Sequence, residues 1–191
     1  NKVAKVTSST STSIVFPAAT FTAETAPIPV GAAARVVGFA GAAADITAVN
    51  TGKASREYQD AVAFYERTFI TEGMAMLLTQ VAQRLAGKGG EPVIQLQTAF
   101  GGGKTHTMLA VYHLATRKCA LAELAGIPAL VDRAGLMEVP QARVAVIDGS
   151  DRGPSQPRIY GGQSVNTLWG ELAWQLGGAE GFALVAEADA T

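Results

Sequence analysis

A lysine and a threonine that directly follow three glycines are the residues of this chain best suited to chemistry. Gly101, Gly102 and Gly103 let the backbone curl, so that successive N–H groups can point at one phosphate. Lys104 can reach the outer phosphates of a nucleotide, and the Thr105 hydroxyl can ligate Mg²⁺. A helix that begins at this turn would add its unpaired N–H groups and its dipole. The pattern therefore predicts a site for ATP and Mg²⁺.

The spacing departs from the usual phosphate-loop pattern G-x-x-x-x-G-K-[ST] in one place. Counting back from Gly103, Thr98 stands where the first glycine is expected. The other interpretation is a structural glycine turn before a helix. We favour the phosphate loop, because a structural turn has no reason to place Lys104 and Thr105 directly after the glycines.

Two further residues are candidates for this site. His106 follows the motif directly and either lies near the nucleotide or packs beneath the loop, and packing is the favoured interpretation. Asp148 follows an apolar run and resembles a Walker B aspartate, which handles Mg²⁺. The next residue is Gly149 rather than a glutamate that could act as the base. An aspartate that simply opens a turn is an equally good interpretation of Asp148.

The elements around the motif follow the order strand, glycine loop, helix. Residues 92–96 (PVIQL) and 143–147 (RVAVI) are short apolar runs that predict buried strands. A helix is expected from Lys104 to Arg117, and Ser164 is a candidate cap for a last helix. Further apolar stripes at helical spacing are expected upstream; they comprise Tyr58, Val62, Tyr65 and Phe69, and then Met74, Leu77, Leu78, Val81 and Leu85. We therefore expect an α/β fold with a P-loop NTPase-type parallel sheet flanked by helices. We expect this sheet to be incomplete, with some of its strands missing.

Composition narrows the classes of function. The 191 residues include 15 basic and 16 acidic ones, so net charge gives no reason to expect nucleic-acid binding. The single cysteine, Cys119, cannot form an internal disulfide, and a cytoplasmic location fits. No apolar run reaches the length of about 20 residues that spans a bilayer, so no membrane partner is expected. Residues 1–44 are low in complexity and predict a poorly ordered or loosely attached extension, and residues 45–191 are expected to be the front part of a P-loop ATPase domain.

From about residue 45 onward, the chain resembles the bacterial and archaeal ATPase family catalogued as domain of unknown function 499. The resemblance rests on residues 95–107 (QLQTAFGGGKTHT), with support from residues 56–73 and 167–176. It implies an AAA-like ATPase of a kind often found beside DNA-modification or phage-defence genes. Lys104 and Thr105 would then bind the phosphates and Mg²⁺.

The same resemblance implies that the Walker B strand and the catalytic base come later than residue 191. The partners would be the nucleotide, the remainder of the ATPase or other subunits, and DNA indirectly. This chain would be the front part of an ATPase that does not hydrolyse ATP alone. The alternative is a truncated or degenerate P-loop module that binds nucleotide without hydrolysis.

Overall fold

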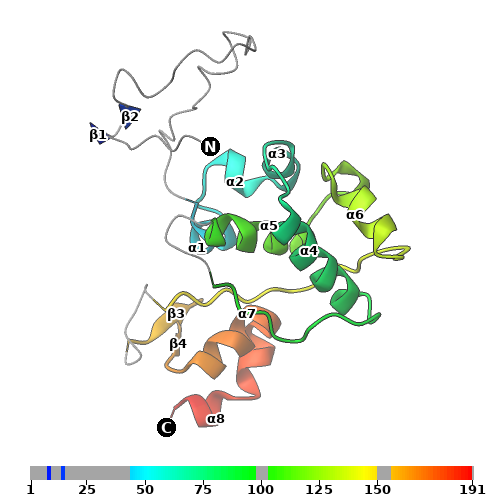
Figure 1. The fold of residues 1–191 in the computed structure, drawn as a ribbon. Coiled ribbons are helices and arrows are strands. Elements are labelled where there is room, and N and C mark those ends of the chain that lie inside the picture. Colours follow the sequence, from blue (N-terminus) through cyan, green and yellow to red (C-terminus); the bar gives the residue numbers. More distant parts are fainter. Residues whose placement is uncertain (1–7, 10–13, 16–43, 98–102, 150–155, 191) are drawn as a thin grey trace, which may run out of the picture. The chain divides into compact units, whose positions relative to one another are not determined.

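The computed structural model describes residues 8–9, 14–15, 44–97, 103–149 and 156–190, which are coloured in Figure 1. The chain divides into two units, Asn1–Ala43 and Ala44–Thr191. In the first unit, strand β1 (Ser8–Ser9) pairs antiparallel with β2 (Ile14–Val15). The extension predicted for residues 1–44 otherwise lies outside the described residues, so its predicted lack of order stays a prediction.

The second unit is mainly helical where it is described. Its helices are α1 (Ile46–Asn50), α2 (Arg56–Gln59), α3 (Ala61–Glu66), α4 (Glu72–Leu85), α5 (Lys104–Thr116), the short 3₁₀ helix η1 (Leu121–Glu123), α6 (Ile127–Arg133), α7 (Leu168–Ala183) and α8 (Ala186–Asp189). Two strands, β3 (Arg158–Tyr160) and β4 (Gln163–Val165), form an antiparallel hairpin before α7.

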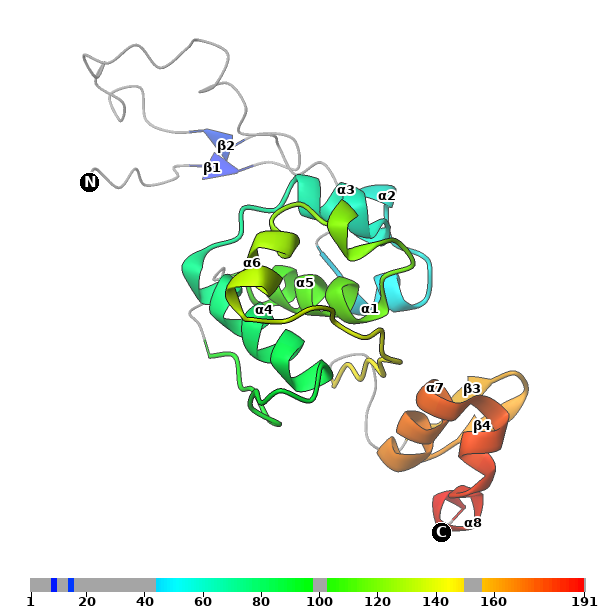
Figure 2. The ribbon, with the colours of Figure 1, turned by 90° about the vertical axis from the view of Figure 1, so that its right-hand side faces the viewer.

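Helix α5 is the centre of the main core. Leu109, Ala110 and Leu114 on α5 are buried in one cluster with residues of α3, α4 and α6. Figure 2 shows α5 running between these helices, with α4 beside it. The hydroxyl of Tyr65 donates a hydrogen bond of 2.6 Å to the backbone carbonyl of Ala110, which ties α3 to the middle of α5. This packing fixes the direction in which α5 presents its first turn.

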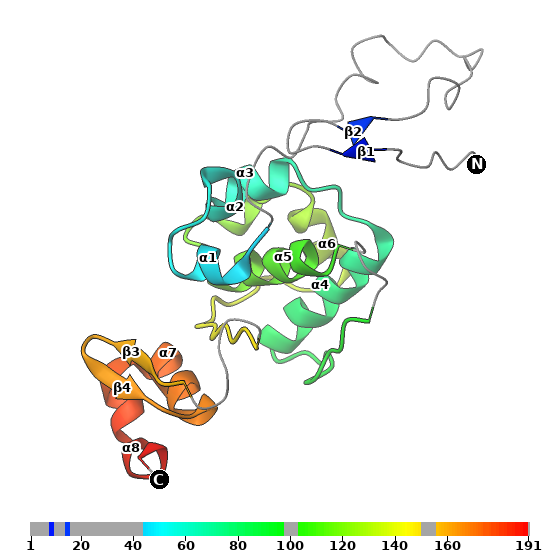
Figure 3. The ribbon, with the colours of Figure 1, turned by 90° about the vertical axis from the view of Figure 1, so that its left-hand side faces the viewer.

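Helix α7 packs on the β3–β4 hairpin through polar and aromatic contacts (Figure 3). The rings of Tyr160 and Trp174 stack with their centroids 5.7 Å apart. The fully buried carboxylate of Glu171 accepts a hydrogen bond from the Tyr160 hydroxyl at 3.1 Å and lies 3.2 Å from the Arg158 Nε. An ion pair of this kind anchors the hairpin to the helix, because leaving either charge buried alone would be costly.

The predicted α/β class, with a P-loop NTPase-type parallel sheet, is wrong. The described residues are mostly helical, and their strand pairs are two short antiparallel ones, β1–β2 and β3–β4. Residues 92–96 and 143–147, predicted as buried strands, form no strand. A strand needs a ladder of backbone hydrogen bonds to a neighbour. Within the described part of the chain, no backbone–backbone hydrogen bond of this kind reaches either segment.

Candidate functional site

Of the turn before α5, the structure describes Gly103. Gly103 has a φ of 73°, in the left-handed region that favours glycine, and it caps the N-terminus of α5 without a side chain of its own. Helix α5 begins at Lys104 and continues to Thr116, so the predicted helix is confirmed. Gly101 and Gly102, the other two predicted loop glycines, lie outside the described residues.

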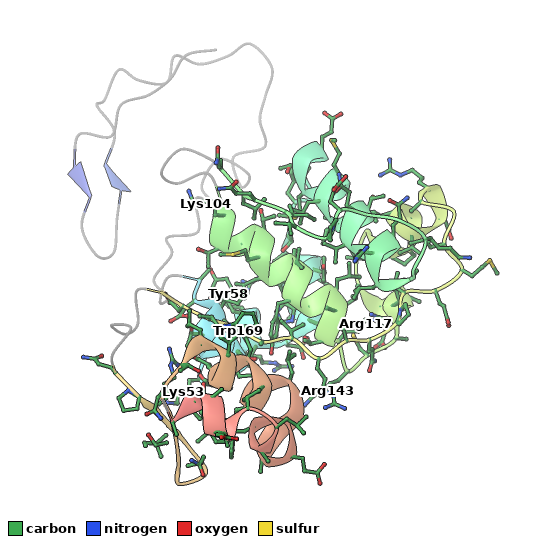
Figure 4. All side chains as sticks on the ribbon, turned by 90° about the horizontal axis from the view of Figure 1, so that it is seen from below. Lys53, Tyr58, Lys104, Arg117, Arg143 and Trp169 are labelled. Carbon is green, nitrogen blue, oxygen red and sulfur yellow. The ribbon has the colours of Figure 1, made fainter. Side chains whose placement is uncertain are left out.

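The first turn of α5 is electropositive. It contains no acidic residue, and its N-cap residue, Gly103, has no side chain that could cap it. The N–H groups at the start of the helix and the helix dipole place a partial positive charge there, and Lys104 adds a full one. Figure 4 shows Lys104 at this end of α5 and Arg117 at the opposite end. An anion is therefore favoured at this turn.

A cleft of about 840 Å³ begins at this turn and follows one face of α5. The residues that α5 contributes recur at helical spacing, so they lie on the same side of the helix over about two turns; they are Lys104, Thr105, Met108, Val111 and Tyr112. Leu77 and Val81, one turn apart on α4, add to the apolar lining. The volume lies in the usual range for small-molecule sites.

Two segments without regular secondary structure complete the cleft. Residues 94–96 and 144–149 line it, and these are the parts of the chain that the sequence predicts as strands and their ends. Asp148 belongs to the second segment. The structure thus brings Lys104, Thr105 and Asp148 to one cleft, although Asp148 is far from the other two in sequence.

His106 packs beneath the turn and is not among the residues that line the cleft. Its ring lies on Phe64 of α3, with centroids 4.6 Å apart. Its Nε2 is 3.0 Å from the hydroxyl of Thr68. That hydroxyl uses its single hydrogen on the Phe64 carbonyl at 2.7 Å, so His106 must be the donor through Nε2–H. Burial lowers the pKa of His106, which favours this neutral form.

The chain matches a known protein family over most of its length. Residues 39–190 match the DUF499 N-terminal domain. The chain belongs to the DUF499 family. Searches of curated proteins and of solved structures found no match. In the described part of this DUF499 domain, no helix combines the length and apolar character needed to cross a membrane.

The structure adds one acidic residue to the candidate site that the motif did not indicate. Asp45 also lines the cleft, where its carboxylate caps α1 by accepting hydrogen bonds from the N–H groups of Thr47 at 2.8 Å and Ala48 at 3.1 Å. An aspartate just before a helix is a recognisable cap in sequence. Its place in the cleft is not recognisable, because that depends on how α1 packs against α5.

Proposed function

We propose that this DUF499 domain binds ATP with Mg²⁺ at the start of α5. Lys104 would contact the outer phosphates, the N–H groups of the first turn would surround them, and the Thr105 hydroxyl would ligate Mg²⁺. The observation that carries the proposal is that Lys104, Thr105 and Asp148 line one cleft. This arrangement supplies a cation, a metal-binding hydroxyl and a carboxylate to the same ligand.

Electrostatics also supports an anionic ligand. A lysine in the first turn of a helix lies at the positive end of the dipole, which is unfavourable in isolation. A phosphate placed between Lys104 and these N–H groups would be attracted by both. The left-handed Gly103 leaves the approach to these N–H groups without a side chain.

Mg²⁺ fits the few polar groups at this position. It keeps several of its waters and is usually held by one or two carboxylates together with substrate phosphates. In the part of the chain that the structure describes, no three histidine, cysteine or acidic side chains form a metal cluster. A nucleotide-borne Mg²⁺ with Thr105 and Asp148 nearby needs no such cluster.

The domain would act as the phosphate-binding part of an ATPase, with the rest of that ATPase or other subunits as partners. Hydrolysis requires a group that positions water and usually an arginine as well as the phosphate site. Asp148 is the candidate to orient Mg²⁺ or water. Binding without hydrolysis is the outcome if these further groups are not supplied.

Isothermal titration calorimetry with ATP and Mg²⁺ tests the proposal. Lys104→Ala removes a charge-assisted contact of about 1.5–3 kcal/mol, so affinity should fall roughly 10- to 150-fold. Lys53→Ala is the matched control, because Lys53 is exposed and does not line the cleft (Figure 4). Equal affinity of the wild type and Lys104→Ala would contradict the proposal.

A further inference from the structure

The side-chain amide of Gln175, on α7, pairs with the backbone of Val146. Its Oε1 accepts a hydrogen bond from the Val146 N–H at 2.8 Å, and its Nε2 donates one to the Val146 carbonyl, also at 2.8 Å. One residue of a strand exchanges the same two bonds with its partner in an antiparallel sheet. A single side chain therefore does for residue 146 what a neighbouring strand would do.

The amide of Gln175 is held in one orientation from all sides. Its Oε1 accepts a second hydrogen bond, from the Nδ2 of Asn50 at 3.2 Å. Its Nε2 donates a second one, to the Oε1 of Glu171 at 3.2 Å. All four hydrogen-bonding positions of the amide are thus used. A flipped amide would set its NH₂ group against two donors and its oxygen against two acceptors, so the observed orientation is strongly preferred.

These bonds join the two sides of the cleft. Asn50 accepts a hydrogen bond of 3.1 Å from the hydroxyl of Tyr112, which lines the cleft on α5. On the other side, Val146 precedes Asp148 by two residues, a span of about 7 Å at most in an extended chain. The Gln175 amide therefore links the helix that begins at Lys104 to the segment that ends in Asp148.

We propose that Gln175 is a positioning residue that sets where the Asp148 carboxylate lies relative to the start of α5. It would thereby control the part of nucleotide binding that depends on Mg²⁺; this second statement rests on the proposed function above. Residues that orient metal-binding groups typically alter metal affinity by about 10- to 100-fold when they are lost. The inference concerns Gln175 acting through Val146, without any contact between Gln175 and the nucleotide.

Hydrogen exchange of the Val146 amide tests the geometry without nucleotide. In the wild type, Gln175 should protect this amide from exchange. Gln175→Leu keeps a similar side-chain volume but has no hydrogen-bonding group. In this variant the Val146 amide should exchange at least about tenfold faster. Gln163→Leu is the control, because Gln163 is exposed and its side chain donates a local hydrogen bond to the carbonyl of the next residue. Equal exchange at Val146 in wild type and Gln175→Leu would overturn the inference.

ATP affinity in Mg²⁺ and in EDTA tests the positioning role. In the wild type, the affinity in Mg²⁺ divided by the affinity in EDTA measures how much Mg²⁺ contributes to binding. Gln175→Leu should lower this ratio about tenfold and leave the affinity in EDTA unchanged. Asp148→Asn should lower the ratio by a similar factor. The double variant should lose no more than either single one, because both act through one carboxylate. An equal loss of affinity in Mg²⁺ and in EDTA, or an unchanged ratio, would overturn the positioning role. If the wild type binds no ATP, the proposed function fails, while Val146 exchange still decides whether Gln175 holds this segment.

Discussion

Two regions of the domain are stabilised in different ways. The main core cluster, built around α5, consists of apolar residues that lie between Val49 and Val139. Beyond it, the described residues between 143 and 189 combine a few buried apolar side chains, such as Val165 and Phe182, with polar side chains that are themselves buried or half-buried. Glu171 has no exposed surface and Asp189 is only 3% exposed, and Gln175 holds Val146.

Apolar contacts and buried polar contacts differ in how closely the neighbouring groups must match them. Apolar burial is non-directional and follows the area removed from water. A buried polar group is stabilising only if each of its donors and acceptors has a partner. The region around α5 should therefore respond most to the loss of volume, whereas the described residues between 143 and 189 should respond most to the loss of single hydrogen-bonding groups.

The largest effect is expected from a change of volume beside α5. Leu114 has no exposed surface, so Leu114→Ala should lower the free energy of unfolding by about 2–5 kcal/mol. Val93, directly before residues 94–96 that line the cleft, is 82% exposed. Val93→Ala should therefore change the free energy of unfolding by no more than about 0.5 kcal/mol. Urea unfolding followed by far-UV circular dichroism measures both.

Similar losses in these two variants would break the comparison. They would mean that residues 92–96 are packed as tightly as α5, against the exposure seen for Val93. A small loss for Leu114→Ala alone would instead mean that the core around α5 relaxes to fill the space left by the side chain.

A smaller effect is expected from one carboxylate in the second region. Asp189 accepts hydrogen bonds from the Thr167 N–H and hydroxyl, at 2.8 and 2.6 Å, and from the Asn166 N–H at 2.8 Å. Asp189→Asn replaces an ionised acceptor and should cost about 2 kcal/mol at neutral pH. Both tryptophans of the chain lie on α7, so their fluorescence reports unfolding of this region. Asp132→Asn, at an exposed aspartate, is the control.

The pH dependence of the same carboxylate gives a second measurement. Burial alone raises the pKa of Asp189, but the hydrogen bonds from Thr167 and Asn166 outweigh it and lower the pKa below its ordinary value. The stabilisation is therefore complete above the unfolded pKa of about 3.9 and is lost as pH falls toward the folded pKa. Below about pH 4, the free energy of unfolding measured by fluorescence should fall more steeply in the wild type than in Asp189→Asn. Equal slopes in the two proteins would contradict this account.

The sequence predicts the apolar region much better than the polar one. The stripe from Met74 to Leu85 lies on α4, and the helix that starts at Lys104 is present, because helical spacing of apolar residues is a local signal. The strands at residues 92–96 and 143–147 were wrong, since a strand depends on neighbours that local sequence does not specify. The cap of α7 is Thr167 rather than the predicted Ser164, which pairs in β4 instead.

The same contrast holds for the candidate site. Lys104, Thr105 and Asp148 were found from a motif and from a predicted strand end, and the structure places them at one cleft. Gln175 and Asn50 were missed. Amide side chains are mostly exposed in proteins, so nothing in their sequence positions marks the buried amide network. Such networks depend on pairs that are distant in sequence, and only the three-dimensional arrangement reveals them.

The smallest effect is expected from His113, the buried histidine of the α5 region. Its Nε2 must donate to the Tyr58 carbonyl at 2.8 Å, because a carbonyl can only accept. Burial lowers the pKa of His113, although the Tyr58 hydrogen bond and the nearby Asp60 act in the opposite direction. The unfolded chain therefore binds the proton more readily, and stability should fall as pH decreases from about 6.5 toward the folded pKa.

His113→Gln keeps an N–H donor for Tyr58 and removes the titration. Urea midpoints at about pH 7.5 and about pH 5.5 should differ less in this variant than in the wild type. A residual difference is expected from His106, whose pKa burial also lowers. This window lies well above the acid window of Asp189, so the two regions should lose stability at separate pH values. An unchanged difference between the two midpoints in His113→Gln would mean that the pH response of the α5 region comes from another group.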